Sequence, residues 1–401
     1  MAVISPLGSA EQAAGRQHYW DGIRALLMWF GIPYHASLIY RAQPEWSVSL
    51  DTKSPSIVFI GQMLSTFRMP CFFIVAGFFS ALILARTDTR IWVKNRLVRL
   101  LVPFATAAVL VNGFQISLTH LDEFVTGAIS YQEYVSRTSY DYTHLGDHWV
   151  RHLWFLLALS CYSVAMISVK PMIDRFVAKF KSDKLLPNNK YLLSVLCIVL
   201  LICYILFVKS VIRLSSHAHL DITLHGFLPW YDTAINAPFF LMGYMLVQSK
   251  RWSVIFFSKS TVLDLFGLAF ALVSALTATF NPDSRVILLL SDCVSAFLVS
   301  RLVIYLFKTH FKKESLWVRK IVDASFTIYL VHQPMVAIAA IFFITLSVPA
   351  FVSYILIVFI VTGLSFYFHQ LVAKSDLAVF LFNGVSRSKR SSSNLHGATG
   401  R

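Results

Sequence analysis

The segment Tyr19–Tyr40, YWDGIRALLMWFGIPYHASLIY, is long enough to cross a lipid bilayer as a helix, yet it contains an aspartate, an arginine and a histidine. Ten residues separate Arg24 from His35. At about 100° per residue, both side chains lie on one helix face, roughly 16 Å apart along the axis. Asp21 precedes Arg24 by three residues and shares that side. Because charges inside a spanning helix are costly and usually face protein or water, the segment predicts an intramembrane functional site.

The rest of the chain predicts a polytopic helical membrane protein. Of its 401 residues, 57% are hydrophobic and 14% are charged, whereas a soluble protein has about 25% charged residues. Successive apolar segments of sufficient length indicate membrane-spanning helices. We expect an all-α bundle of about ten spans, at 20–40, 57–85, 101–118, 152–169, 191–208, 229–248, 261–280, 286–307, 321–346 and 351–372.

The distribution of positive charge orients this bundle. A formal net charge of +15 first suggests nucleic acid as a partner, but the basic residues lie in short stretches between the apolar segments. If the N-terminus is cytoplasmic, 26 of the 35 Lys and Arg residues fall in cytoplasmic segments and 7 in outer segments. This bias predicts that both termini are cytoplasmic and that the partner is the lipid bilayer rather than nucleic acid.

The chain is expected to have three parts: a polar N-terminal segment, 1–18; a membrane domain, 19–372; and a basic, disordered cytoplasmic tail, 373–401. The sequence contains no internal repeat and no glycine-rich nucleotide loop. Its five cysteines fall within apolar segments and lack metal-ligand spacing with histidine. We therefore expect neither a metal nor a bound cofactor.

His35 is the leading candidate for catalysis. Pro33 and Gly31 stand just before it and can bend the helix to admit water or substrate. An imidazole in a partly dry site is suited to act as a general base. The alternative is a packed histidine bonded to a carbonyl, although Arg24 and Asp21 on the same helix face favour a functional site. Asp21 lies too far along the helix to orient His35 and is assigned to Arg24.

Arg68 is the second candidate, because it lies deep in the second predicted span. A deep arginine cannot easily reach the membrane surface and needs an anionic partner. That partner is either a group of the substrate or donor, or a buried carboxylate, for which Asp292 in the eighth predicted span is a candidate.

Arg96 and Arg99 form a third feature at the cytoplasmic entrance of the span that contains Pro103. Their spacing of three residues places two guanidinium groups on one face, where they could clamp a phosphate. The alternative is an ordinary positive-inside signal. Arg24 has a similar pair of interpretations: it contacts an anionic donor, or it reaches lipid phosphate.

Two further segments add polar residues to the bundle, one at its outer face and one that reaches mid-membrane. His152 and Trp154 open the fourth predicted span; His152 could orient an incoming hydroxyl, and Trp154 is also an expected interface anchor. Ser325, Tyr329 and His332 share one face of the ninth span. His332 lies near mid-membrane and is either a site residue or a helix-packing hydrogen bond.

Taken in order, these motifs resemble the integral-membrane acyltransferase 3 family. The resemblance covers about residues 19–372 and rests on Arg24 with His35, Phe72–Phe78, Arg96 with Arg99, His152–Leu156 and Tyr329–His332. Ala76 departs from the family pattern, which usually has a serine before the glycine. No role for a hydroxyl is therefore expected there.

The resemblance implies acyl transfer from cytoplasmic acyl-CoA, across a bacterial inner membrane, to a hydroxyl of a periplasmic glycan. The branch that it resembles most transfers succinyl from succinyl-CoA to glucose of osmoregulated periplasmic glucans, with glucan synthesis machinery as a further partner. In this scheme Arg96 and Arg99 hold the CoA phosphates, and His35 deprotonates a glucosyl hydroxyl that enters past His152 and Trp154.

Arg68 would then bind either the free carboxylate of the succinyl group or the developing oxyanion. Other interpretations remain open. They are O-acetylation of another surface polysaccharide, a multi-span anion or proton transporter, and a non-catalytic scaffold. A transporter is disfavoured because the hydropathy shows no inverted repeat.

Overall fold

The computed structural model describes residues 18–41, 53–144, 147–179, 189–217, 227–311 and 316–385. Within these ranges the chain is helical and contains no strand, as expected for an all-α protein. Eight helical segments are long and apolar enough to cross a membrane. They are α4 (Pro55–Leu84), α5 (Thr89–Ala107) continued by η1 (Ala108–Asn112) and α6 (Gly113–Leu118), α10 (Trp154–Lys179), α11 (Lys190–His217), α14 (Thr261–Phe280), α15 (Arg285–His310), α16 (Leu316–Thr345) and α17 (Ala350–Val372).

The other two predicted spans are also helical but do not meet these limits of length and composition. The first forms two shorter helices, α2 (His18–Trp29) and α3 (Gly31–Leu38), with a break at Phe30. Pro33 explains the break, because it has no N–H to donate to the carbonyl four residues earlier. The second forms α12 (Trp230–Gln248), whose apolar content is lowered by polar side chains in its first half.

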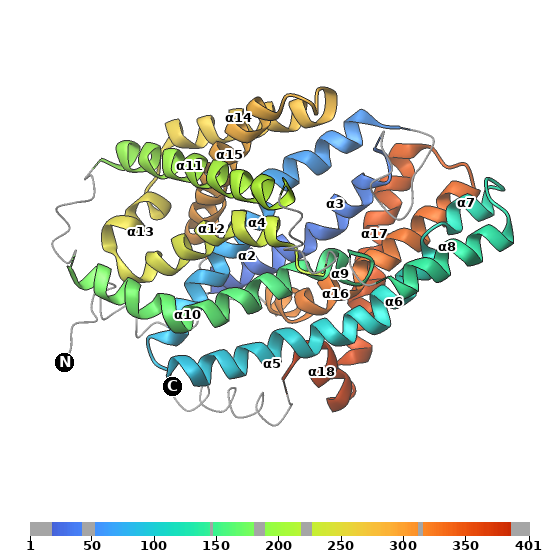
Figure 1. Ribbon diagram of the computed structural model, residues 1–401, viewed down its shortest axis with the longest axis horizontal. Helices are drawn as coiled ribbons and strands as arrows, with labels where there is room; N and C mark the ends of the chain where they lie inside the picture. Colours follow the sequence, from blue (N-terminus) through green and yellow to red (C-terminus); the bar gives the residue numbers. More distant parts are fainter. Residues whose placement is uncertain are drawn as a thin grey trace.

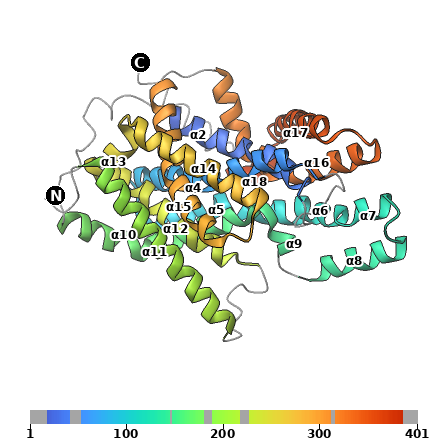
Figure 2. The same ribbon diagram turned by 90° about the horizontal axis from the view of Figure 1, so that it is seen from above.

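Helix α4 lies at the centre of the bundle and packs against α2, α3, α12, α14 and α15 (Figures 1 and 2). Its approach to α12 requires glycine on both helices. A Cβ atom at Gly77 would lie 1.9 Å from the carbonyl oxygen of Phe240, and one at Gly243 would lie 1.9 Å from that of Ile74. Small residues let membrane helices pack backbone to backbone, so this pair fixes where α12 crosses α4.

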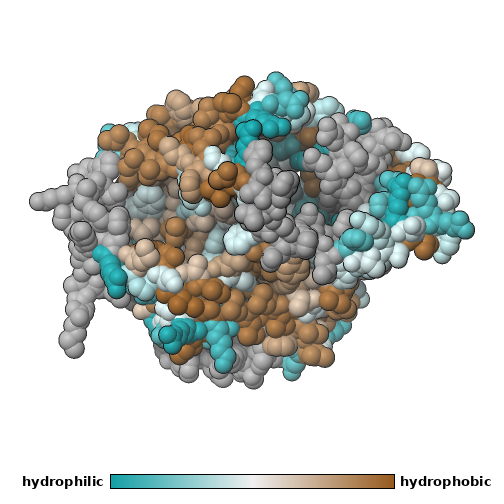
Figure 3. Space-filling model, in the orientation of Figure 1, coloured by the Kyte–Doolittle hydropathy of each residue, from teal (hydrophilic) through white to brown (hydrophobic). Residues whose placement is uncertain are grey.

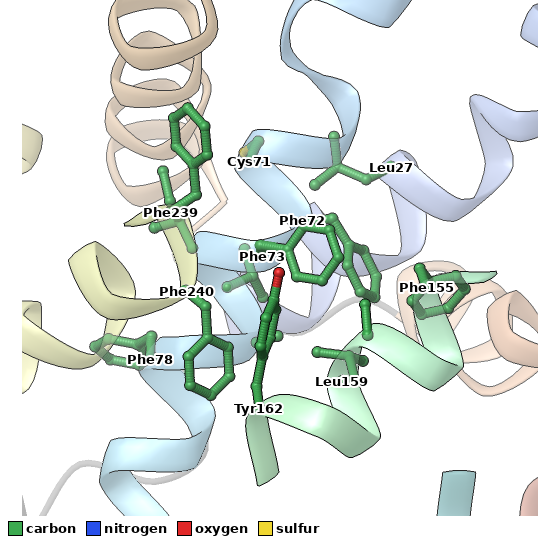
Figure 4. Close-up of a cluster of buried hydrophobic side chains, with 14 of the residues drawn as sticks. Leu27, Cys71, Phe72, Phe73, Phe78, Phe155, Leu159, Tyr162, Phe239 and Phe240 are labelled. Atoms are coloured by element: carbon green, nitrogen blue, oxygen red, sulfur yellow. The ribbon is translucent and has the colours of Figure 1, made fainter. Parts of the chain in front are cut away.

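Aromatic side chains fill the space around this crossing. Figure 4 shows Phe72 and Phe73 of α4 beside Phe155 and Tyr162 of α10 and Phe240 of α12. The ring of Tyr162 lies 5.1 Å from that of Phe240, and its hydroxyl donates to the carbonyl of Thr233 on α12. The cluster holds α4, α10 and α12 together.

The outer surface matches the chemistry of a membrane protein. Apolar side chains cover broad parts of the face shown in Figure 3, whereas hydrophilic ones gather at the right-hand end and in smaller groups at the upper and lower edges. That end holds α7 (Leu121–Val125) and α8 (Tyr131–Thr143), which Figure 1 shows beyond the end of α6. The polar segment between the third and fourth spans is therefore largely helical.

The tail differs from the expectation of disorder in one part. Residues Asp376–Asn383 form α18, which packs against α5. Its apolar side chains, among them the buried Val379 and Phe382, supply the reason, because burying them against α5 stabilises a helix too short to fold alone. The polar segment 1–17 and the basic segment 386–401 lie outside the described residues, so their expected character stays a prediction.

Arg301, on α15, holds the start of α14 and the end of α13 (Lys250–Phe257). Its fully buried guanidinium donates to Asp264 and to the carbonyls of Ser258, at 2.9 Å, and Ile255, at 3.3 Å. This arginine is therefore part of the scaffold.

Candidate active site

Two pockets lie inside the bundle, and each contains one group of the predicted residues. The larger has a volume of about 710 Å³, and we call it the histidine pocket; its predicted members are His35, Arg68, His152, Trp154 and Tyr329. The smaller has a volume of about 360 Å³, and we call it the arginine pocket; its predicted members are Arg24, Arg96 and Arg99. Phe155 lines both pockets.

Three imidazoles from distant parts of the chain come together at the histidine pocket. His35 lies on α3, His152 in the short turn η2 (Arg151–Leu153) and His332 on α16. The ring of His332 lies 5.2 Å from that of His35 and 5.2 Å from that of His152, and the other two rings are 6.2 Å apart. All three side chains are buried, and His332 stands behind the other two rather than in the pocket wall.

Main-chain carbonyls fix the tautomers of two of these rings. His332 Nδ1 lies 2.7 Å from the carbonyl oxygen of Tyr329, so that nitrogen carries the proton and donates it. His152 Nε2 lies 3.2 Å from the carbonyl of Leu330 and donates in the same way. The other nitrogens, His332 Nε2 and His152 Nδ1, have no hydrogen-bond partner among the described residues. Each ring therefore presents an unprotonated, buried nitrogen.

The turn that carries His152 is held in an unusual conformation. Arg151 has a φ of 41°, which non-glycine residues rarely adopt. Its side chain donates to the hydroxyl of Thr119 at 2.9 Å, and the amide of Asn112 donates to the carbonyl of Trp149 at 2.8 Å. Asn112 ends the π-helical segment η1, an element that often occurs at functional sites. Such local strain persists only where surrounding contacts enforce it.

Tyr329 couples α16 to the same turn. Its hydroxyl donates to the carbonyl oxygen of His152, and its ring lies 5.3 Å from the imidazole of that residue. Two hydrogen bonds therefore join α16 to η2 in opposite directions, one from Tyr329 and one from His152. The relative positions of His152 and His332 are set by this pair.

Arg68 is a buried cation in the wall of the histidine pocket. Its guanidinium carbon lies 4.6 Å from the ring centroid of Tyr34, in a cation–π contact. No carboxylate of the described residues is within ion-pair distance. The expected candidate, Asp292, lines the same pocket but accepts a hydrogen bond from Ser274 instead. The predicted ion pair between Arg68 and Asp292 is therefore wrong, and Asp292 is hydrogen-bonded to α14 instead.

The arginine pocket gathers three guanidinium groups. Arg24 pairs with Asp21 at 3.2 Å, and the guanidinium of Arg96 lies 5.4 Å from the ring centroid of Trp92. Among the residues that line the pocket, Asp323 is the single acidic one, against three arginines including Arg99. The charge at this pocket therefore favours an anionic ligand.

Apolar side chains form the remaining wall of the arginine pocket toward Phe155. They include Phe72 and Ala76 of α4 and Leu156 and Leu159 of α10. Ser325 of α16 also lines this pocket, while Tyr329, one turn further, lines the other. One face of α16 thus runs past both pockets, and an extended ligand anchored at the arginines would lie against apolar wall before reaching the histidines.

The sequence argument missed several residues that line these pockets, including the charged Lys209, Asp232 and Arg285 of the histidine pocket. Tyr34 and Gln333 line the histidine pocket, and each stands next to a predicted histidine, so adjacency could have indicated them. Phe155 lies within the motif that contains His152 and Trp154, but its apolar character pointed only to packing. Across the part of the chain that the structure describes, no three His, Cys, Asp or Glu side chains are arranged to hold a metal ion.

Comparison with known proteins agrees with the predicted family. A family model described as an acyltransferase domain matches residues 17–370. Glucans biosynthesis protein C from Escherichia coli strain K12 is 24% identical over 383 residues, which are 94% of this chain and 97% of that protein. The same protein from Escherichia coli O139:H28 shows the same identity and coverage. No solved structure matches. Since the family model spans most of the chain, this multi-pass helical membrane protein belongs to the acyltransferase 3 family and is an acyltransferase.

Proposed function

We propose that the protein transfers a succinyl group from cytoplasmic succinyl-CoA to a glucose hydroxyl of a periplasmic glucan, in the inner membrane of a bacterium. The observation that carries this proposal is the pair of pockets that share Phe155, one lined by three arginines and the other by His35. The name of the Escherichia coli relative, glucans biosynthesis protein C, supports a glucan as the acceptor.

The donor would enter the arginine pocket from the cytoplasm. Arg96 and Arg99 would hold its phosphates, because guanidinium groups bind phosphate oxygens in a bidentate manner. Arg24, aligned by Asp21, adds a third positive charge. The uncharged pantetheine arm would lie along the apolar wall formed by Ala76 and its neighbours, and would carry the thioester toward Phe155.

His35 would act as the general base. It would remove the proton from a glucosyl hydroxyl while the hydroxyl oxygen attacks the thioester carbonyl; the carbon–sulfur bond then breaks and the CoA thiolate leaves. His152 and Trp154 would position the glucose, since an imidazole and an indole face suit a sugar hydroxyl and a sugar ring. Tyr329 and His332 would hold His152 in place.

Arg68 would recognise the acyl group of the donor. Because no carboxylate of the described residues pairs with this buried cation, the free carboxylate of a succinyl group would supply the missing charge. The developing oxyanion of the tetrahedral intermediate is the other anionic group that comes within its range. The two roles predict different donor preferences, which are tested below.

Mass spectrometry of periplasmic glucans tests the reaction directly. Glucans from cells with the gene, without it and with the His35→Ala variant should be compared. We expect succinyl-substituted glucose only where the intact gene is present. Acetyl groups on the glucans would identify acetyl-CoA as the donor in place of succinyl-CoA. Acylation of another polysaccharide would identify that polysaccharide as the acceptor. Identical glucans in all three strains, with no other acylated product, would overturn the enzymatic proposal in favour of a transporter or a scaffold.

A further inference from the structure

The two pockets approach each other at a single aromatic side chain. Phe155 is 3% exposed and contributes to the walls of both pockets. Its backbone neighbours divide between the two sides: Trp154 lines the histidine pocket and Leu156 lines the arginine pocket. The first turn of α10 therefore forms the partition between them.

Two further rings complete this partition. Phe72 of α4 lines only the arginine pocket, and its ring lies 5.0 Å from that of Phe155 at an interplanar angle of 73°. Tyr329 of α16 lines only the histidine pocket, and its ring lies 4.4 Å from that of Phe155 at 78°. Edge-to-face contacts thus join one ring from each of three helices, and Figure 4 shows Phe72 and Phe155 in this cluster.

The three rings differ in how firmly they are held. Tyr329 is tied by its hydroxyl to the carbonyl of His152. Phe155 has no polar atom, and pocket space adjoins it on two sides. A close-packed ring cannot turn without displacing its neighbours, whereas a ring that borders free volume can. Of the three rings, Phe155 is therefore the one that adjoins both pockets and is held by packing alone.

We propose that Phe155 is the barrier between the pockets and that its ring sets which acyl groups pass. The inference rests on the proposed function, because it assigns the donor to one pocket and the acceptor to the other. With the ring in place, water in the histidine pocket cannot reach a thioester waiting in the arginine pocket. When the ring turns, a slender acyl group passes toward His35, while a branched or bulky one is refused.

The side reaction that this barrier prevents is hydrolysis. Water would attack the thioester carbonyl and the carbon–sulfur bond would break; the oxygen stays on the released carboxylic acid and the proton passes to the CoA sulfur. Exclusion of water from reactive intermediates is a general requirement for group transfer. An enzyme with an open partition would consume acyl-CoA without acceptor.

A labelling experiment tests the barrier without any acyl donor. Ala76 lines the arginine pocket, so Ala76→Cys places a thiol there. The reagent is an anionic methanethiosulfonate that does not cross membranes, and labelling is measured in vesicles of either orientation. Labelling of the parent protein, which has only its native cysteines, is subtracted as background. We expect labelling from one membrane face with Phe155 present and from both faces with Phe155→Ala. Labelling from both faces with Phe155 present, or from one face after its removal, would overturn the proposal.

A kinetic experiment then links the barrier to turnover. We expect purified Phe155→Leu and Phe155→Ala to release CoA from succinyl-CoA without acceptor at least tenfold faster than the parent, and to accept bulkier acyl groups. Phe240→Leu is the matched control, because Phe240 is a buried ring of the same cluster that lines neither pocket. Unchanged hydrolysis in folded Phe155 variants that still transfer acyl groups would refute the proposal. Absence of any succinyl-CoA turnover in the parent would instead count against the proposed function, and the labelling result would still decide the barrier.

Discussion

The histidine and arginine pockets differ in how their polar side chains are held. In the arginine pocket, Asp21 pairs with Arg24, and the ring of Trp92 contacts the guanidinium of Arg96. In the histidine pocket, main-chain carbonyls fix the tautomers of His152 and His332. Charge alone is enough to retain an anionic ligand, whereas proton transfer needs a nitrogen of defined protonation at a defined position. The two pockets are therefore built for different tasks: retention in one, chemistry in the other.

The largest expected effect comes from removing the base. His35→Ala should lower acyl transfer by about 10²–10⁴-fold, the usual contribution of a general base, and should leave donor binding within twofold. Transfer of labelled succinyl to glucan measures the first quantity, and calorimetric titration with succinyl-CoA measures the second.

His120→Ala serves as the control for that variant. His120 pairs with Asp141 at 3.3 Å in the polar end of the molecule and lines neither pocket. Its replacement should leave transfer unchanged. If His35→Ala retained transfer, the general base would have to be another of the clustered imidazoles, and the division of tasks between the pockets would lose its main support.

The next effect separates ligand retention from membrane topology. Arg96→Ala combined with Arg99→Ala should weaken donor binding by roughly 10²-fold, since a hydrogen bond to a charged group contributes about 1.5–3 kcal/mol. The matched control is Arg86→Ala with Arg90→Ala, which removes the same charge from the same stretch between α4 and the apolar part of α5, outside the lining of either pocket. Calorimetric titration distinguishes the pairs. Equal affinities would assign all four arginines to topology.

Helical periodicity explains why the arginine pocket was predictable. Asp21 with Arg24, and Arg96 with Arg99, lie three residues apart, and local geometry brings such residues together in any helix. The long apolar spans were equally accessible, because a bilayer demands apolar segments of a set length; eight helical segments of the described residues meet that test, against the ten that were predicted. Helix α18 was missed because its apolar segment is only 8 residues long. It is too short to be recognised as a membrane span, and it lies beside a basic, serine-rich tail.

The histidine pocket could be predicted only in part. Periodicity indicated that Tyr329 and His332 share a face, but it could not say that this face meets η2 and α3. That arrangement depends on tertiary contacts such as the α4–α12 crossing at Gly77 and Gly243. The positive φ of Arg151, which aims the turn before His152, has no sequence signature, since arginine does not favour that conformation. Asp292 was wrongly predicted as the partner of Arg68, because periodicity could not show that tertiary contacts place Asp292 against Ser274 of α14.

Two buried arginines sharpen the distinction between scaffold and site. Arg301→Met should destabilise the protein by about 3 kcal/mol, because it leaves the half-buried Asp264 without its cation and the carbonyls of Ser258 and Ile255 without their donor. Arg68→Met strands no carboxylate of the described residues and should leave stability near that of the parent. It should instead lower transfer from succinyl-CoA about tenfold more than transfer from acetyl-CoA if Arg68 reads the acyl carboxylate. Thermal unfolding in detergent and paired donor assays measure the two effects.

Equal loss with both donors would move Arg68 to the oxyanion, a role that does not depend on the acyl group. A stability loss in Arg68→Met as large as that of Arg301→Met would make Arg68 a scaffold residue and remove it from the proposed site. Either result would change the role assigned to Arg68 in the histidine pocket and would leave the roles proposed for the arginine pocket unchanged.

The smallest expected effect concerns the edge of the arginine pocket. Gly384 ends α18 with a φ of 64°, and a Cβ atom there would lie 2.5 Å from the Cα of Arg99. Gly384→Ala therefore combines a strained backbone, about 1–2 kcal/mol for a left-handed alanine, with a clash against the helix that carries Arg99. The end of α18 should move away from α5 and loosen the pocket wall at Val379 and Asn383. We expect succinyl-CoA affinity to fall about fivefold with little change in the transfer rate at saturating donor. Helix α18 lines only the arginine pocket. A change confined to donor affinity would therefore show that donor binding in this pocket is independent of the chemistry in the histidine pocket. A fall in the rate at saturating donor would show instead that the wall at Arg99 is coupled to the chemistry at His35.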